Sequence, residues 1–314
     1  MERAACSNIR QCCTLDRDTQ LHGTLLFASG FRVRSATDCR VHLPSNEDRA
    51  VAVIQRQGQK KVTRYIRFQN GHSSTYGIEA SGTVRELEGD LFHHKETGKT
   101  HALKDLKLLH PATPKNIICV GLNYRSHIGG RPAPERPEVF FKPLSCLQNP
   151  GDPIVYPSDA TDLHYEGELV IVLGARVHKA SKEEARAAIF GYTCGNDVSE
   201  RQWQLGPNHD RQWWRAKGCD TFGVFGPAIV TGLDGDNLKL QTRLNGEVVQ
   251  AQTTADLIFD CATMVSFASQ YMTIEAGDII YTGTPGVTRP MKPGDVVEVE
   301  LEGIGVLSNP VVKG

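Results

Sequence analysis

Two glutamates open an apolar, strand-like segment, and their spacing gives them a shared direction. Glu166 and Glu168 begin the stretch EGELVIVLG, and alternate residues of a strand point to the same face. The next residues on that face are Val170 and Val172, so the face becomes apolar. Burying two carboxylates together is unfavourable unless a cation or a proton neutralises them. The spacing alone leaves two interpretations open: an ordinary solvent-exposed Glu-x-Glu, which is the simpler one, and a cation-binding pair.

A third carboxylate follows after one predicted helix. Asp197 lies in GYTCGNDVSE, and a strand, a short helix and a second strand can return the chain to the two glutamates. Three oxygen donors without a cysteine or histidine partner are typical of sites for hard cations. Mg²⁺ prefers octahedral oxygen coordination and keeps positions open for substrate, and Mn²⁺ fits the same donors. The three acids are therefore candidate ligands of Mg²⁺ or Mn²⁺.

These acids need a scaffold, and the surrounding sequence favours strands. Short apolar or alternating runs separated by Gly and Pro indicate many strands and few helices. Ser181 and Glu184 form a capping-box pattern that predicts the start of a short helix. The pair Asn245–Gly246 predicts a two-residue hairpin turn. Residues 255–272 contain no Gly or Pro and are predicted to form the longest helix. We expect a mainly β (α+β) fold.

Composition is uneven along the 314 residues and suggests three parts. Residues 1–61 hold four of the nine cysteines, and we expect an N-terminal extension without ordered structure. Residues 62–112 alternate in a strand-like way, which predicts a small strand-rich domain. Residues 113–314 carry all three tryptophans and 14 of the 16 prolines, and we expect them to form the domain that holds the acids.

Charge and cysteine usage exclude several classes of protein. The chain has 35 Lys and Arg against 36 Asp and Glu, which argues against nucleic-acid binding through a basic surface. No apolar run reaches the roughly 18 residues that a membrane span needs, so we expect no membrane association. The cysteines form no Cys-x-x-Cys pair, which indicates reduced thiols and a cytoplasmic location. Arg3 and Arg10, with no acid between them, leave a mitochondrial presequence as the alternative.

Several motifs together resemble the fumarylacetoacetate hydrolase family. In chain order they are HYEGELVIVLG, NDVSERQWQ, RAKGCDTFGVFGPAIV, LNGEVVQ, GDIIYTGTPGV and PGDVVEVELEGIGVL, within residues 113–314. VTRYIRF and the segment after it resemble the small N-terminal domain of many bacterial-type members. The resemblance implies a mixed, rolled β-sheet with few short helices, a homodimer, and chemistry on 2-keto or 2,4-diketo acids. It assigns Mg²⁺ to Glu166, Glu168 and Asp197.

The resemblance also implies roles for residues outside the acidic group. His127 in NYRSHIGG matches the family's catalytic histidine, and histidine can act as a base near neutral pH. Lys217 in RAKGCDT matches an active-site lysine that can stabilise developing negative charge. The positions that match substrate-binding residues are Tyr124, Arg201, Gln204, Thr221 and Thr284. Without the resemblance, surface and turn roles would be the simpler interpretation of each.

The histidine loop departs from the family pattern at one position. Hydrolytic and decarboxylating members usually carry a glutamate three residues after this histidine, in a mobile lid, where this chain has Gly130. Glu135 is a candidate substitute, although its spacing does not establish that role. Without a carboxylate that orients the imidazole, activation of water by His127 is less secure. Tautomerisation and isomerisation become more competitive, because they need no attacking water.

Three functions remain open at this stage. The first is a Mg²⁺-dependent hydrolase that cleaves a C–C bond in a 2,4-diketo acid, such as an acylpyruvate or a fumarylacetoacetate-like substrate. The second is an isomerase, tautomerase or decarboxylase acting on a 2-keto dicarboxylic acid such as oxaloacetate. The third is a non-catalytic, metal-binding dimer. Trp203, Trp213 and Trp214 either line a pocket for an apolar tail or pack in a core or interface.

Overall fold

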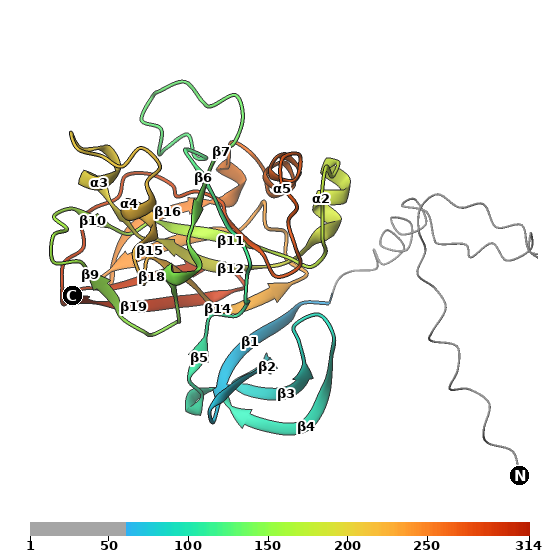
Figure 1. Ribbon diagram of the computed structural model, residues 1–314. Coiled ribbons are helices and arrows are strands. Elements are labelled where there is room, and N and C mark those ends of the chain that lie inside the picture. Colours follow the sequence, from blue (N-terminus) through green and yellow to red (C-terminus); the bar gives the residue numbers. More distant parts are fainter. Residues whose placement is uncertain (1–60) are drawn as a thin grey trace, which may run out of the picture. The chain divides into compact units, whose positions relative to one another are not determined.

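The computed structural model describes residues 61–314, and twelve of their strands form one sheet. Its main path runs in the order β4-β3-β2-β1-β14-β12-β11-β17-β6-β7, with β5 paired to β1 and β8 to β14 (Figure 1). The bounds of these strands are β1 Thr63–Asn70, β2 Ser73–Ala80, β3 Thr83–Gly89, β4 His94–Ala102, β5 Leu108–Leu109, β6 Ile117–Gly121, β7 Glu138–Lys142, β8 Leu147–Gln148, β11 Gly167–Leu173, β12 Ile189–Asp197, β14 Gly223–Thr231 and β17 Ile279–Tyr281. Parallel pairing of β17 with β6 makes the sheet a mixed one.

A second sheet and a few short helices complete the described structure. Its five strands follow the order β16-β15-β18-β19-β9, and β10 pairs with β13 separately. These strands are β9 Ile154–Tyr156, β10 Leu163–His164, β13 Ser199–Glu200, β15 Lys239–Leu244, β16 Glu247–Thr253, β18 Val296–Leu301 and β19 Gly305–Lys313. The helices are α2 Lys182–Ala188, α3 Arg201–Leu205, α4 Trp214–Gly218 and α5 Cys261–Ser269, with 3₁₀ turns at Leu103–Asp105, Leu144–Cys146 and Thr254–Asp256. None of the helices in residues 61–314 has both the length and the apolar character to cross a bilayer.

The mainly β prediction is confirmed, together with two of its local details. Asn245 and Gly246 have φ angles of 53° and 81°, as a two-residue hairpin turn between β15 and β16 requires. Ser181 caps α2, since its hydroxyl accepts the N–H of Glu184 while the Glu184 carboxylate accepts the N–H of Ser181. Both features are local in sequence, which is why their residue types alone were informative.

The helix predicted over residues 255–272 was wrong in its extent. The structure has α5 from Cys261 to Ser269, preceded by a 3₁₀ turn. Asp260 stops the helix from extending backward, because its carboxylate accepts the N–H of Thr263 and its own backbone is extended. With nine residues, α5 is still the longest of the helices described.

Replacing Ser181 by alanine is expected to lower the free energy of unfolding by about 1 kcal/mol, because one half of the capping box is lost. Urea unfolding of the full chain measures this difference. The exposed Ser158 provides a matched Ser→Ala control that should leave the transition midpoint unchanged. Equal midpoints for both variants would show that the cap does not contribute to global stability.

The strands expected for the small N-terminal domain extend the large sheet rather than forming one of their own. In β1, Thr63 pairs with Thr231 of β14, and Tyr65 pairs with Ile229. The Arg64 guanidinium also donates to the carbonyl of Ile304. This domain is thus held to the rest of the fold by main-chain pairing as well as by side chains.

Strand β11 lies in the middle of the hydrophobic core. Every residue of Gly167–Leu173 is buried, because β12 and β17 flank the strand and other elements cover both its faces.

The free cysteines found in residues 61–314 fit the reduced state predicted for them. Four are buried and one is half-buried: Cys119, Cys146, Cys194 and Cys261, and Cys219.

Candidate metal centre

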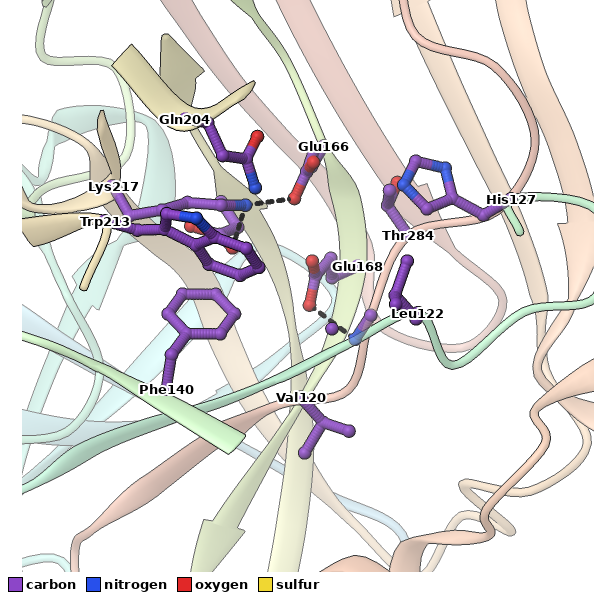
Figure 2. Close-up of a pocket in the computed structure, with 13 residues that line it drawn as sticks. Val120, Leu122, His127, Phe140, Glu166, Glu168, Gln204, Trp213, Lys217 and Thr284 are labelled. Carbon is purple, nitrogen blue, oxygen red and sulfur yellow. Dashed lines mark hydrogen bonds and ion pairs between the residues drawn. The ribbon is translucent and has the colours of Figure 1, made fainter. Parts of the chain in front are cut away.

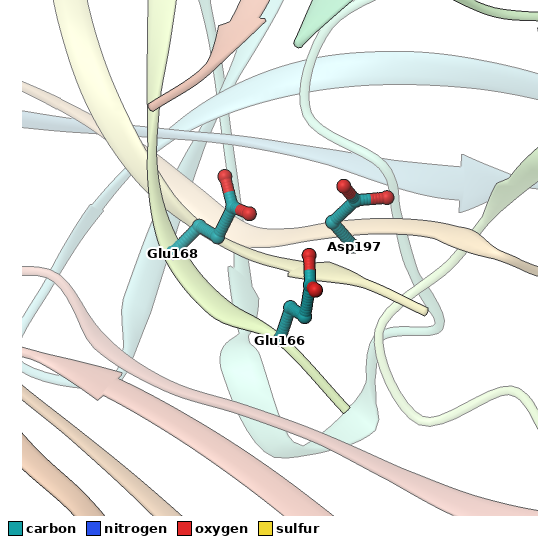
Figure 3. A group of neighbouring side chains, drawn as sticks. All are labelled: Glu166, Glu168 and Asp197. Atoms are coloured by element: carbon teal, nitrogen blue, oxygen red, sulfur yellow. The ribbon is translucent and has the colours of Figure 1, made fainter. Parts of the chain in front are cut away.

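Three carboxylates meet where β11 begins and β12 ends. Glu166 directly precedes β11, Glu168 lies within it, and Asp197 is the last residue of β12. The antiparallel register sets Gly167 opposite Asn196, and the N–H of Asp197 donates to the carbonyl of Glu166 over 2.9 Å. One oxygen from each acid lies within 4.8 Å of the others, and all three side chains are buried (Figure 3). The strand pairing inferred from the sequence therefore brings the three acids together.

Two lysines and an arginine contact two of these acids. The Lys217 ammonium lies 2.6 Å from Oε2 of Glu166 and 2.7 Å from Oδ2 of Asp197. The Lys142 ammonium lies 2.5 Å from Oδ1 of Asp197, and its side chain is fully buried. Arg201 approaches Oε1 of Glu166 to 2.6 Å. Glu166 and Asp197 are thus neutralised by groups of the protein itself.

The pKa values of the two glutamates are shifted in opposite directions. Burial would raise the pKa of Glu166, but attraction from Lys217, Arg201 and His127 outweighs it and lowers the pKa below its ordinary value. Burial raises the pKa of Glu168 well above its ordinary value, and repulsion from Asp197 and Glu166 adds to this effect. Glu168 is therefore the member of the group whose negative charge is least stabilised.

The environment of Glu168 fits a bound divalent cation. Its Oε2 accepts the N–H of Gly283 over 2.7 Å, and no ion pair reaches it within residues 61–314. A buried carboxylate beside two others is costly unless a cation compensates it. Three oxygen donors without nitrogen or sulfur are those that hard cations prefer. The buried acidic group is therefore suited to a divalent metal ion.

A pocket opens beside the three acids. Polar residues and an aromatic pair face it from different sides (Figure 2). Phe140 and Trp213 pack edge to face, and the Lys217 ammonium lies 5.1 Å from the Phe140 ring centroid. The ring of His127 points from its loop toward Glu166 in Figure 2. The pocket is lined by Val120, Gly121, Leu122, His127, Phe140, Glu166, Glu168, Asp197, Gln204, Trp213, Lys217, Gly283 and Thr284.

Seven of the ten residues predicted from the sequence line this pocket: His127, Glu166, Glu168, Asp197, Gln204, Lys217 and Thr284. Arg201 is not among the lining residues. Its guanidinium contacts the Glu166 carboxylate and also donates to Gln204 and to Thr288. The structure does not bring Tyr124 or Thr221 to the lining. Tyr124 is fully buried, and the Thr221 hydroxyl accepts the N–H of Val155.

The three tryptophans have different environments. Trp213 lines the pocket, whereas Trp203 packs in a small core beside Arg215, whose guanidinium lies 4.4 Å from the ring centroid. Trp214 is exposed. Glu135, the candidate substitute acid, is exposed, and no ion pair to His127 is found in the described part of the chain. One tryptophan therefore fits the pocket prediction and one fits the core prediction.

Sequence reasoning missed three contributors to the centre: Lys142, Phe140 and the N–H of Gly283. A signal for the first two was present, since residues two apart on a strand share a face and both belong to VFFK. Lysine is almost never fully buried unless its charge is paired, as the charge of Lys142 is by Asp197. The Gly283 N–H carried no comparable signal, because a backbone donor does not depend on residue type.

Comparisons with known proteins agree with this architecture. Residues 116–312 match the family described as "Fumarylacetoacetate (FAA) hydrolase C-terminal", and residues 63–111 match "Rv2993c-like, N-terminal". Protein Rv2993c of Mycobacterium tuberculosis is 44% identical over 244 residues, which cover 76% of this chain and 91% of that protein. The bovine (Bos taurus) "Oxaloacetate tautomerase FAHD2A, mitochondrial" is 39% identical over 221 residues, covering 66% of this chain and 70% of its own length.

Solved structures with named activities are also similar. The 5-carboxymethyl-2-hydroxymuconate delta-isomerase of Mycobacterium smegmatis is 40% identical, with a TM-score of 0.74 over 80% of this chain and 100% of its own. A maleylpyruvate hydrolase of Sphingobium, solved with manganese(II) and pyruvate, is 27% identical, with a TM-score of 0.66 over 80% and 99% of the chains. The chain belongs to the fumarylacetoacetate hydrolase family and carries an Rv2993c-like N-terminal domain.

Proposed function

We propose that this chain is a divalent-metal-dependent tautomerase or isomerase of a 2-keto dicarboxylic acid such as oxaloacetate. Relatives near 40% identity support this, since they carry the names of a tautomerase and an isomerase. Two hydrolases among the similar solved structures are more distant, at 32% and 27% identity. The comparisons therefore favour the alternative predicted from the sequence over the C–C bond hydrolase predicted first.

The observation that carries the proposal is that His127 and the three acids line one pocket, while the position of the lid acid is Gly130. Gly130 is exposed, and no carboxylate of residues 61–314 pairs with the imidazole. A base that lacks a carboxylate partner is less suited to activating water than to moving a proton to and from carbon. This combination supports enolisation without hydrolysis.

Tautomerisation of oxaloacetate breaks a C3–H bond and forms an O–H bond at the keto oxygen, so no atom is gained or lost. A bound divalent cation would supply Lewis-acid polarisation of that keto group. We assign the removal and return of the C3 proton to His127. Lys217 lies beside the acids and can stabilise negative charge that develops on the enolate. Gln204 and Thr284 line the same pocket and are available to orient the substrate.

Three further assignments belong to the same proposal. Mg²⁺ is the proposed metal, and Mn²⁺ suits the same oxygen donors. We propose a homodimer, as the family resemblance implies. We also propose that the enzyme works in the cytoplasm or in mitochondria, the latter because the bovine relative is named as mitochondrial.

Two assays on the purified full chain test the function. With Mg²⁺ present, we expect accelerated conversion of enol-oxaloacetate to the keto form, followed by the loss of enol absorbance, and no pyruvate release from acetylpyruvate. EDTA should abolish the acceleration. The Glu135→Gln variant should match the wild type, since this exposed residue lies outside the pocket lining. Pyruvate release from acetylpyruvate without tautomerisation would restore the hydrolase, and pyruvate formed from oxaloacetate would identify a decarboxylase. Metal binding with no turnover at all would leave the non-catalytic dimer.

A further inference from the structure

Two hydrogen bonds join the histidine loop to a single glycine of the turn after β17. The Nδ1 atom of His127 lies 2.6 Å from the carbonyl oxygen of Gly286. The N–H of the same glycine donates to the hydroxyl oxygen of Ser126 over 3.0 Å. We refer to Ser126, His127 and Gly286 as the histidine clamp. Both polar backbone groups of one residue thus hold the segment that carries the proposed base.

The chemistry of the clamp determines which ring nitrogen carries the proton. A carbonyl oxygen can only accept a hydrogen bond, so Nδ1 of His127 must be the donor. In the neutral ring Nε2 then keeps its lone pair. The ring points from the loop toward Glu166 across the pocket (Figure 2). The nitrogen opposite the clamp is therefore the one available to a substrate.

We propose that the Gly286 carbonyl is the positioning group of His127, fixes its Nδ1–H tautomer and presents Nε2 as the proton acceptor. In this arrangement the acceptor beside the imidazole is a backbone carbonyl and not a carboxylate. A neutral partner orients the ring without adding a negative charge beside it. The tautomer assignment depends only on the clamp geometry, whereas its catalytic meaning rests on the proposed function.

The rest of the turn, residues 284–288, ties the clamp to the metal centre. The Thr284 hydroxyl donates to the carbonyl of Gly167 over 2.9 Å, between the two glutamates of β11. The Gln250 amide donates to the carbonyl of Pro285 over 2.6 Å. The Thr288 hydroxyl accepts from Arg201, which in turn contacts Glu166. The carbonyl that orients the base is consequently fixed relative to the strand that carries the acids.

The clamp leads to an expectation for the missing lid acid. A Cβ at Gly130 would meet nothing within 4 Å, so Gly130→Glu is sterically allowed, although the φ of 80° adds local strain. Because Nδ1 of His127 already has its acceptor, the added carboxylate should not take over the ring. We expect no gain in acetylpyruvate hydrolysis for this variant. A rise in hydrolysis would show that the clamp is weaker than a carboxylate partner and would overturn the proposal.

The direct test is the tautomer itself. The full chain, labelled with ¹⁵N only at histidine, gives ring signals whose shifts distinguish Nδ1–H from Nε2–H, and the signal missing from His127→Gln identifies the residue. We expect the neutral ring of His127 to be Nδ1–H. An Nε2–H signal would overturn the proposal whether or not the enzyme turns over oxaloacetate. If instead the tautomer is as expected and turnover is absent, the clamp stands and the proposed function fails.

Loosening the clamp provides the kinetic test. Ser126→Ala removes the acceptor of the Gly286 N–H, and we expect kcat to fall about threefold to tenfold with KM unchanged. The exposed Ser158→Ala variant is the matched control. The rise in melting temperature on adding Mg²⁺ should be the same in both variants and in the wild type. An unchanged kcat for Ser126→Ala, or a loss of the Mg²⁺ effect, would contradict a role confined to positioning the base.

Discussion

Replacing Glu168 by glutamine is expected to lower turnover by a factor on the order of 10² or more and, at the same time, to stabilise the metal-free protein. Without metal, this buried carboxylate faces Asp197 and Glu166 and receives one N–H from Gly283. Glutamine keeps the shape and the acceptor oxygen but removes the charge. The variant is therefore expected to bind metal less well, and it also loses an electrostatic penalty that the metal-free protein carries.

Thermal unfolding with and without metal separates these two effects. In EDTA the melting temperature of Glu168→Gln should exceed that of the wild type, by about 2–4 °C for each kcal/mol of relieved repulsion. Saturating Mg²⁺ should raise the wild-type value, since a ligand at 100 times its Kd stabilises by about 2.7 kcal/mol. The variant should gain much less. Turnover of oxaloacetate, measured on the same samples, should be lower for Glu168→Gln than for the wild type.

A matched control comes from an exposed glutamate. Glu88 lies in β3, and its side chain pairs with Lys95 at the surface. Glu88→Gln removes the same charge and should change stability by no more than about 1 kcal/mol, with the Mg²⁺ effect intact. If Glu168→Gln instead melts below the wild type in EDTA and keeps the full Mg²⁺ effect, Glu168 is not a metal ligand.

The acidic group shows what strand periodicity can predict. Glu166 and Glu168 share a face because residues two apart always do on a strand, and the apolar residues after them indicated that this face is buried. Asp197 could be placed beside them because one short helix separates two strands that pair directly. Each step depends only on residues of one strand or on strands that follow one another closely in the sequence. The position of these acids was therefore accessible from sequence, and so was the mainly β fold.

The residues that sequence reasoning did not find depend on contacts between distant segments. Lys142 reaches Asp197 only because β7 pairs with β6 and β6 with β17, an arrangement that no local pattern specifies. The Gly286 carbonyl meets His127 across 159 positions of sequence. Thr221 matches a family motif, yet it does not line the pocket. Its φ is 72°, and its hydroxyl accepts a hydrogen bond from the N–H of Val155. Motif matching locates a residue in the chain, whereas its contacts follow from the tertiary structure.

Replacing Gly167 by alanine is expected to be the most damaging small substitution in the centre. A Cβ at this position would lie 2.0 Å from the Thr242 hydroxyl oxygen and 3.0 Å from Oε1 of Gln250. Thr242 is fully buried in close-packed surroundings. One of its two other χ1 rotamers would bring the methyl group to the same point, and the other would turn the hydroxyl and the methyl group into that packing. We expect the free energy of unfolding to fall by about 3 kcal/mol, which is at the upper end of the usual cost of overpacking a core. Because Glu166 and Glu168 flank this residue, the Mg²⁺-dependent rise in melting temperature should also be lost.

Second-site changes at Thr242 show whether this contact is the cause. The Thr242 hydroxyl has no hydrogen-bond partner within residues 61–314, so Thr242→Val alone should be close to neutral, and it should not rescue Gly167→Ala because the volume remains. Thr242→Ala removes the atom at 2.0 Å and should restore part of the stability. The contacts at 3.3 Å with Cβ of Thr242 and at 3.0 Å with Gln250 prevent full recovery. A coupling energy of about 1 kcal/mol or more is therefore expected from the double-mutant cycle.

Gly121 provides the matched glycine, since it also lines the pocket but has room for a side chain. A Cβ there would meet its nearest neighbours at 3.8 and 3.9 Å, which are ordinary contacts, and its φ is not in the left-handed region. Gly121→Ala should change the urea midpoint little or raise it slightly. If Gly167→Ala unfolds at the same urea concentration as Gly121→Ala and still binds Mg²⁺, then β11 can move away from Thr242. In that case the close packing of the two sheets is not what fixes the two glutamates, and the hydrogen bonds of Asn196 and Gln250 to the backbone of Glu166 and Gly167 must hold them instead.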